Sequence, residues 1–325
     1  MKTKYKTRRL LTTFASFLLA LAVLCIPVFY AGQKADASAG NNEDRIVVLG
    51  SGLNNSQRID TLERLGIDPE TGMTLYTVTG SDAERFIDQS FADSAMISSV
   101  IVEFKEEGAG VSTEIVTPEN ITKVKTYQYS NAAITAGIYD CLITVGSIRP
   151  VTGNSALTGV YKAAEIQGIE LDQDKMIAGN EELITITVIE DNNANNEDFD
   201  SEDFSKALTE IKAQIAELVK EEGSDNINIE QITVIINNVL NNYNINISQA
   251  DINRLAGTLE KFKNTLSAED VNKILEQLQS FGEKTWGIAL DFIESAKEEG
   301  WWDQVVDFFR RIIEAIVEFF KDLFN

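Results

Sequence analysis

Two glycine-containing turns are the first candidates for chemistry. Gly50–Gln57 and Pro150–Ser155 each follow an apolar segment and precede a helical pattern. A helix N-terminus presents unpaired N–H groups and a positive dipole end, so it can hold an anion, and glycine lets a ligand approach the backbone. If the two preceding strands are parallel neighbours, both turns lie at the sheet edge where α/β folds bind ligands. The side chains and glycines that would line this site are Ser51, Gly52, Asn54, Thr152, Gly153, Asn154 and Ser155. The alternative is a pair of ordinary capped turns.

A second candidate is a calcium site in an acidic, Asn-rich stretch. Asp191, Asn193, Asn195 and Glu202 stand at positions 1, 3, 5 and 12 of the EF-hand loop pattern. Calcium prefers oxygen ligands at this spacing, but Asn196 occupies the place of the usual glycine. The alternative is a solvated linker without a metal, and no other cofactor is expected.

The C-terminal segment is the third candidate. Residues 301–324 form an amphipathic helical pattern whose apolar side covers about half of the circumference, which is broad for a helix that faces a core. One interpretation is packing against the preceding helices. The other is contact with a protein partner, or peripheral contact with a membrane, through Trp301, Trp302, Phe309 and Phe320.

The composition excludes several kinds of catalysis. The 325 residues include no histidine and two cysteines, Cys25 and Cys141. Ser-His-Asp and Cys-His catalysis, His-ligated zinc and multi-thiolate metal sites are therefore excluded. Whether the chain is an enzyme stays open, but the absence of a catalytic constellation favours a protein without enzymatic activity.

The N-terminal residues have the layout of a secretory signal peptide. A basic head precedes an apolar run from Leu10 to Phe29, and Ala35-Asp36-Ala37 offers a cleavage site, so residues 1–37 are the expected leader. An uncleaved membrane anchor is the alternative. The net charge of −23 argues against nucleic acid as a partner. We expect a secreted, extracellular protein, with association with the cell envelope as one option.

The pattern along residues 40–190 indicates an α/β domain with a mixed sheet, because strand-like and helix-like segments alternate. The expected strands are 44–49, 74–79, 98–104, 111–117 and 139–145, with the third and fourth paired as a hairpin. The expected helices are 54–65, a short one with a capping box at Ser81–Glu84, 126–136, 156–167 and 172–189.

Beyond residue 190 the pattern changes. Residues 191–203 read as an acidic linker, and residues 204–325 predict an all-α helical domain. Its helices are expected at 203–222, 229–242, 249–263, 268–298 and 301–324.

Two segments resemble the paired signatures of the YpuA-like family, a domain of unknown function in secreted proteins of bacilli and clostridia. They are Asn131–Ile138 (NAAITAGI) and Pro150–Gly159 (PVTGNSALTG), with supporting matches at Val48-Leu49-Gly50 and Glu182-Leu183. The resemblance implies export and a Gram-positive envelope setting, and it supplies no activity. Members of that family typically carry an acidic residue where Gly52 stands, which weakens the anion-site hypothesis.

Three functions follow from these patterns. The favoured one is a non-enzymatic extracellular or cell-envelope protein that binds an unknown protein or envelope component. The second is a small-anion or ligand-binding module that uses turns 50–57 and 150–155. The third is a carboxylate- or cation-dependent enzyme that acts on cell-wall material. The identity of the ligand or partner and the oligomeric state stay open.

Overall fold

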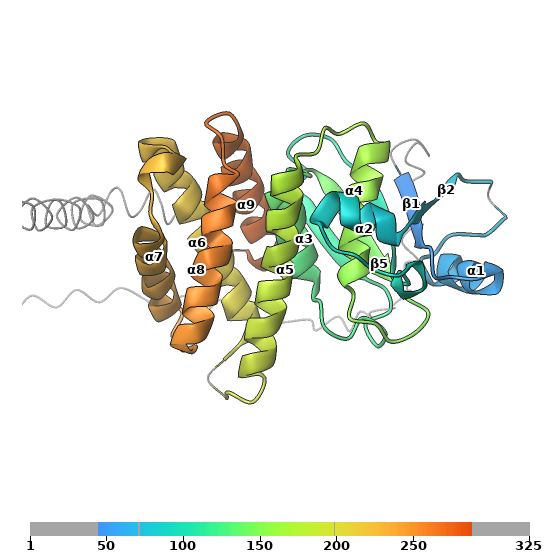
Figure 1. Ribbon diagram of the computed structural model, residues 1–325, viewed down its shortest axis with the longest axis horizontal. Helices are drawn as coiled ribbons and strands as arrows, with labels where there is room; N and C mark the ends of the chain where they lie inside the picture. Colours follow the sequence, from blue (N-terminus) through green and yellow to red (C-terminus); the bar gives the residue numbers. More distant parts are fainter. Residues whose placement is uncertain (1–44, 71, 198, 288–325) are drawn as a thin grey trace, which may run out of the picture. The chain divides into compact units, whose positions relative to one another are not determined.

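The computed structural model describes residues 45–70, 72–197 and 199–287, which belong to one compact unit (Figure 1). The expected signal peptide and the expected helix 301–324 lie outside the described residues. Within the described part, no helix combines the length and the apolar character that a membrane span requires.

A five-stranded mixed sheet forms the N-terminal half, as expected from the alternating pattern. The strands are β1 (Arg45–Gly50), β2 (Leu75–Val78), β3 (Ser99–Phe104), β4 (Val111–Ile115) and β5 (Cys141–Gly146), in the order β2-β1-β3-β5-β4. β1 is parallel to β2 and β4 is parallel to β5, whereas β3 is antiparallel to both of its neighbours. The carboxyl ends of β1, β2, β4 and β5 therefore share one edge of the sheet.

The predicted β3–β4 hairpin is wrong, because β5 lies between these two strands. The reason is visible in their side chains. β4 alternates apolar with polar residues, and its Ser112 and Glu114 are exposed, as suits an edge strand. β5 is more apolar, with Ile143 and Val145 fully buried, so it takes the interior position.

Helices cover both faces of the sheet. α1 (Asn55–Arg64) packs Leu62 against Val47 and Leu49 of β1 on one face. On the other face lie α2 (Gly80–Ile87), α3 (Thr126–Thr135) and α4 (Asn154–Ile166). The N-cap of α2 is Thr79, which bonds Asp82, and not Ser81 as the capping-box pattern predicted.

Five further helices follow, and Figure 1 shows them beside α3 rather than on the sheet. They are α5 (Gln173–Asn193), α6 (Ser201–Glu222), α7 (Ile229–Asn242), α8 (Gln249–Asn264) and α9 (Asp270–Trp286). Short 3-10 turns occur at Asp93–Ala95 and Ser224–Asn226. Two boundaries differ from those expected. The non-helical part of the 191–203 stretch starts only after Asn193 and ends before Ser201, and α9 ends at Trp286 because Gly287 takes a left-handed conformation.

A buried ion pair joins the helices to the α/β layer. Lys212 of α6 and Glu182 of α5 are 0% and 1% exposed, and their charged atoms lie 2.9 Å apart. The Lys212 ammonium also donates to the Asn131 carbonyl at 3.1 Å and the Thr135 hydroxyl at 2.8 Å, both on α3. Thr135 in turn donates to Glu182 at 2.6 Å. We call these four residues the polar joint; every one of them has a partner, and the same apolar core continues on both sides of it.

Candidate functional site

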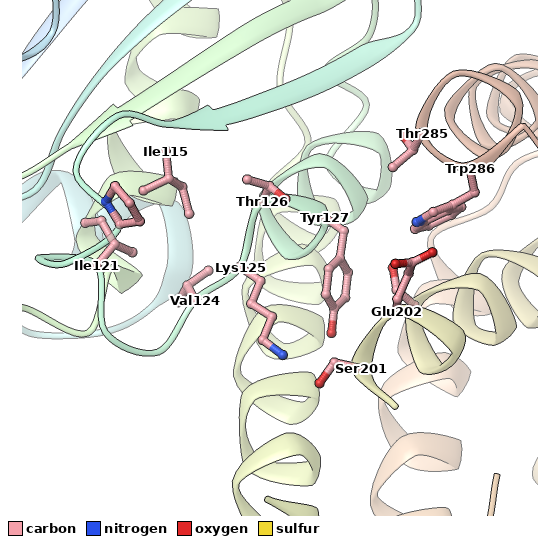
Figure 2. Close-up of a pocket in the computed structure, with 12 residues that line it drawn as sticks. Ile115, Ile121, Val124, Lys125, Thr126, Tyr127, Ser201, Glu202, Thr285 and Trp286 are labelled. Atoms are coloured by element: carbon pink, nitrogen blue, oxygen red, sulfur yellow. The ribbon is translucent and has the colours of Figure 1, made fainter. Parts of the chain in front are cut away.

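An open groove lies where α3, α6 and α9 meet the end of β4 (Figure 2). Its volume is about 570 Å³. Its lining residues are Ile115, Pro118, Ile121, Val124, Lys125, Thr126, Tyr127, Ser201, Glu202, Ser205, Thr285 and Trp286. Ile121, Val124, Tyr127 and Ser205 are buried and form the floor, whereas the rim includes exposed residues such as Thr126 and Thr285. We refer to this site as the α3–α6–α9 groove.

The start of α3 supplies a charged and an aromatic side chain that share one carboxylate. The Lys125 ammonium and the Tyr127 hydroxyl both donate to Oε1 of Glu190, at 2.9 and 2.6 Å. Burial raises the pKa of Tyr127, and the neighbouring Glu190 charge raises it further, so the phenol stays protonated. These contacts neutralise the charge on this side of the groove.

The start of α6 forms the opposite side. Its first backbone N–H groups are already occupied, because the Asp200 carboxylate accepts from the amides of Glu202 and Asp203 at 2.8 and 2.9 Å. The Ser205 side chain is different. Its hydroxyl is fully buried, and it has no hydrogen-bond partner among the described residues. An unpaired buried hydroxyl is unfavourable, so this contact between α6 and its neighbours is incompletely satisfied.

The end of α9 closes the groove. The Trp286 ring is half-buried and packs edge-on against Phe281, with ring centroids 5.0 Å apart. Figure 2 shows Trp286 and Glu202 next to each other, with Tyr127 across from them. Glu202 is itself paired with Lys206 at 2.9 Å. The groove thus combines aromatic and aliphatic side chains with several polar ones, a mixture that is common in ligand sites.

The groove has the size of a ligand site. Its volume falls in the range of about 300–1,000 Å³ that is usual for ligand sites. The two charged side chains in its lining, Lys125 and Glu202, are each held in an ion pair.

The two glycine turns do lie at one sheet edge, although β1 and β5 are not neighbours. β3 separates them, and the serines at its start connect the two turns. The Ser99 hydroxyl accepts from the Gly50 amide at 3.1 Å, and the Ser98 and Ser155 hydroxyl oxygens lie 2.5 Å apart. The expected residues are therefore gathered at one edge, with the antiparallel strand between them.

The space around these turns is filled by the chain itself. A Cβ on Gly52 would lie 2.8 Å from the Ser94 carbonyl, and one on Gly153 would lie 2.5 Å from the Tyr129 hydroxyl. Gly153 also has a φ of 107°, which favours glycine. Both glycines are thus required by close packing, and that requirement needs no ligand.

The polar groups of the turns are largely used within the protein. Ser51 donates to the Asp93 carbonyl at 3.1 Å, and Asn54 caps α1 through the Gln57 amide at 3.0 Å. The Thr152 carbonyl accepts from the Val124 amide at 3.2 Å. Asn154 opens α4 without a side-chain cap. Anion binding by these turns stays a prediction.

The four proposed calcium ligands do not form a loop. Asp191 and Asn193 are in the last turn of α5, where Asp191 pairs with Lys123 at 2.7 Å and Asn193 donates to the Ile189 carbonyl at 2.8 Å. Asn195 is exposed beyond the helix, and Glu202 is on α6. In the described ranges, no group of three or more His, Cys, Asp or Glu side chains is arranged to hold a metal ion. The third set of expected site residues, Trp301, Trp302, Phe309 and Phe320, lies outside the described residues.

Sequence reasoning did not find the groove. Its walls come from three helices and a strand end that are far apart in the chain, and each contributes only one to four residues. The only sequence signal was Trp286, a large aromatic residue near the end of an amphipathic helix.

With this geometry described, comparison with known proteins identifies the family. A family model described as "Protein of unknown function (DUF1002)" matches residues 49–281. The chain belongs to the DUF1002 family. It is also similar to the "uncharacterized protein YpuA" of Bacillus subtilis (strain 168), with 29% identity over 309 residues that cover 94% of this chain and 98% of YpuA. No solved structure matches the chain.

The family match confirms the resemblance of the two signature segments to YpuA-like proteins of Firmicutes. The structure gives these segments a physical role. Asn131 and Thr135 of the first signature, together with Glu182, belong to the polar joint. Gly153 of the second signature packs against Tyr129 of α3. The signature residues therefore position α3 and α4 within this DUF1002 fold.

Proposed function

We propose that this DUF1002 protein is exported and binds another protein without catalysis, by receiving an amphipathic helical segment in the α3–α6–α9 groove. The observation that carries the proposal is the groove itself, an open recess with a buried apolar floor and a fully buried hydroxyl on Ser205 that has no partner among the described residues. Amphipathic helices bind in grooves of this kind through side chains spaced three and four residues apart.

The open rim supports a segment rather than a small molecule. Lys125, Thr126, Glu202 and Thr285 are exposed around the groove, so a ligand placed there keeps one side in water. A surface helix has this requirement, because its polar face stays solvated while its apolar face is buried. The leader-like residues 1–37 support export, and an extracellular or envelope partner follows from that location.

The alternatives have less support. In the two glycine turns, Ser94 and Tyr129 fill the space beside the glycines. Most polar groups of these turns are hydrogen-bonded within the chain. A hydrolytic enzyme needs a positioned acid and base, whereas Lys125 and Glu202 in the groove lining are each held in an ion pair with another residue.

The proposal is tested by photo-crosslinking in cells that export the chain. A photoreactive residue is placed at Thr126 or Thr285 in the groove, or at Asn272, which is exposed on α9 outside the groove. We expect a discrete protein adduct from both groove positions and none from Asn272. Equal adducts from all three positions, or none from the groove, would contradict the proposal.

A matched pair of variants then tests whether the groove is the contact. Thr285→Arg places a long charged side chain in the groove, while Gln279→Arg adds the same charge to an exposed position of the same helix. With the captured protein purified, we expect Thr285→Arg to weaken binding at least about tenfold, which is about 1.4 kcal/mol. Gln279→Arg is expected to leave the affinity unchanged.

A further inference from the structure

We infer that in the free protein the groove is covered by the chain's own C-terminal segment, residues 301–324. This inference rests on the proposed function, because it assigns the first amphipathic segment that the groove receives. A protein partner would then have to displace this segment before it could bind.

The position where the chain leaves the groove is the first argument. α9 ends at Trp286, which lines the groove, and Gly287 breaks the helix with a φ of 66°. The chain therefore continues from the rim. Residues 288–300 span about 45 Å when extended and about 20 Å as a helix, so segment 301–324 reaches the groove in either state.

Complementary chemistry is the second argument. Phe309, Ile312, Ile313 and Ile316 are spaced as positions i, i+3, i+4 and i+7 of a helix. This is the anchor pattern of helices that bind in apolar grooves. A groove of about 570 Å³ receives a few large side chains and not a whole helix, so the contact is expected to centre on these four residues.

Charge selects the chain's own segment over two other occupants. The protein has a net charge of −23, so a second copy is repelled, whereas an attached segment is already in place. An anionic lipid surface is also unfavourable, because acids outnumber bases on the polar face of the segment. The acids are Asp303, Asp307, Glu314, Glu318 and Asp322, and the bases are Arg310, Arg311 and Lys321.

The chain is well suited to cysteine crosslinking. Burial raises the pKa of the Cys141 thiol to about 12, with a further contribution from the Asp140 charge, so this thiol stays unreactive in the folded protein. Replacing Cys25 by serine leaves introduced cysteines as the reactive ones. Thr126→Cys marks the groove, Arg310→Cys marks the segment without removing an anchor, and Asn272→Cys replaces Thr126→Cys in the control.

The test is the rate of crosslinking by a short bismaleimide in the purified full chain. We expect the 126/310 pair to react within one molecule, independently of protein concentration, and at least about tenfold faster than the 272/310 pair. Phe309→Asp or Thr285→Arg in the same background is expected to remove this difference, and Gln279→Arg is expected to keep it. Equal rates for the two pairs would overturn the inference, and so would crosslinks that form only between molecules or a rate unaffected by Phe309→Asp.

The outcomes separate the inference from the proposed function. If the 126/310 pair shows no preference while Thr285→Arg weakens partner binding, the groove binds a partner but is not covered by the segment. If the pair reacts as expected while partner binding ignores Thr285→Arg, the groove is an internal contact and the proposed function fails.

Discussion

Helix α6 meets the α/β layer in two places with opposite properties. Around Lys212, near its middle, the contact is dry, and every charged or polar group of the joint has a partner. Around Ser201–Ser205, at its start, the contact is open and holds a buried hydroxyl with no partner among the described residues. Ser205 and Lys212 are only about 10 Å apart along the helix. The packing of α6 is therefore complete around its middle and incomplete at its start.

The polar joint is a contact that is completed within the chain, whereas the contact at the groove is not. A buried charge is tolerated only when it is paired and hydrogen-bonded, so the polar joint fixes how α3, α5 and α6 fit together. The groove lies beside this joint on the same helix, and there the Ser205 hydroxyl has no hydrogen-bond partner among the described residues.

The largest effect is expected from breaking the joint. Lys212→Met leaves Glu182 as an unpaired buried charge, which typically costs about 3–5 kcal/mol of unfolding free energy. The measurement is urea denaturation at pH 7. Burial lowers the pKa of Lys212, and the charge of Glu182 opposes this shift. The double variant Lys212→Met with Glu182→Met should recover most of the lost stability, because it leaves no unpaired buried charge.

A control on the same helix calibrates this prediction. Lys220 is paired with Glu217 at 3.7 Å, and its side chain is 47% exposed. Lys220→Met is expected to change stability by less than about 0.5 kcal/mol. A loss below about 1 kcal/mol for Lys212→Met would show that the joint does not hold the two layers together.

The second prediction concerns Gly153, another fully packed position. Gly153→Ala forces an alanine into a left-handed backbone conformation and places its methyl group against the Tyr129 hydroxyl. We expect the unfolding free energy to fall by about 2–3 kcal/mol. Gly257, within α8, has open space where the methyl group of an alanine would lie, so Gly257→Ala should stabilise the protein by about 0.5–1 kcal/mol. Thermal unfolding of both variants measures the difference. Similar effects of the two substitutions would contradict the view that the turn is filled.

Local sequence patterns predicted most helices and strands, because each depends on residues close in the chain. The periodicity placed α7 at 229–242 without error, and glycine and serine marked several helix ends. The β3–β4 hairpin failed because strand order depends on which strand buries both faces, a comparison between distant segments.

The candidate site and the polar joint were predicted less well, for the same physical reason. Lys212 looks like any other lysine in a helical pattern, and its burial arises only when Asn131, Thr135 and Glu182 come from two other helices. The groove likewise exists only where α3, α6 and α9 converge. The glycine turns were located correctly at one edge, but glycine in a sequence does not reveal whether a ligand or the chain fills the space beside it.

The third prediction compares the joint with a charged cluster at the surface. Asp82 accepts from Lys162 at 3.0 Å, from Arg85 at 3.1 Å and from the Thr79 amide at 2.9 Å. Burial alone would raise the pKa of Asp82, but these hydrogen bonds outweigh it and lower the pKa. A carboxyl whose pKa is lowered by folding stabilises the folded protein at pH values above its pKa in the unfolded chain. This contribution is lost as the pH falls through its pKa in the folded protein.

Asp82→Asn should therefore lower the unfolding free energy at pH 7 by about 1–3 kcal/mol, less than the loss for Lys212→Met. The difference from the unaltered protein should begin to shrink near about pH 4, where the carboxyl of the unfolded chain protonates, and should disappear as the pH falls through the lowered pKa of the folded protein. Denaturation midpoints measured between about pH 7 and about pH 2.5 test this. A difference that stays constant over this range would show that the cluster acts through packing and not through charge.

The smallest effect on stability is expected in the groove. This prediction directly compares a hydroxyl of the groove with a hydroxyl of the polar joint. Ser205→Ala removes a buried hydroxyl that has no partner among the described residues, so stability should stay unchanged or rise by up to about 1 kcal/mol. Thr135→Val removes a hydroxyl from the joint, which bonds both Lys212 and Glu182, and should cost about 1.5–3 kcal/mol. Urea denaturation of the two variants compares the loss of a hydroxyl that has no partner among the described residues with the loss of one that has two. If Ser205→Ala proved as costly as Thr135→Val, the Ser205 hydroxyl would already have a hydrogen-bond partner in the free protein, and the contrast between the groove and the polar joint would fail.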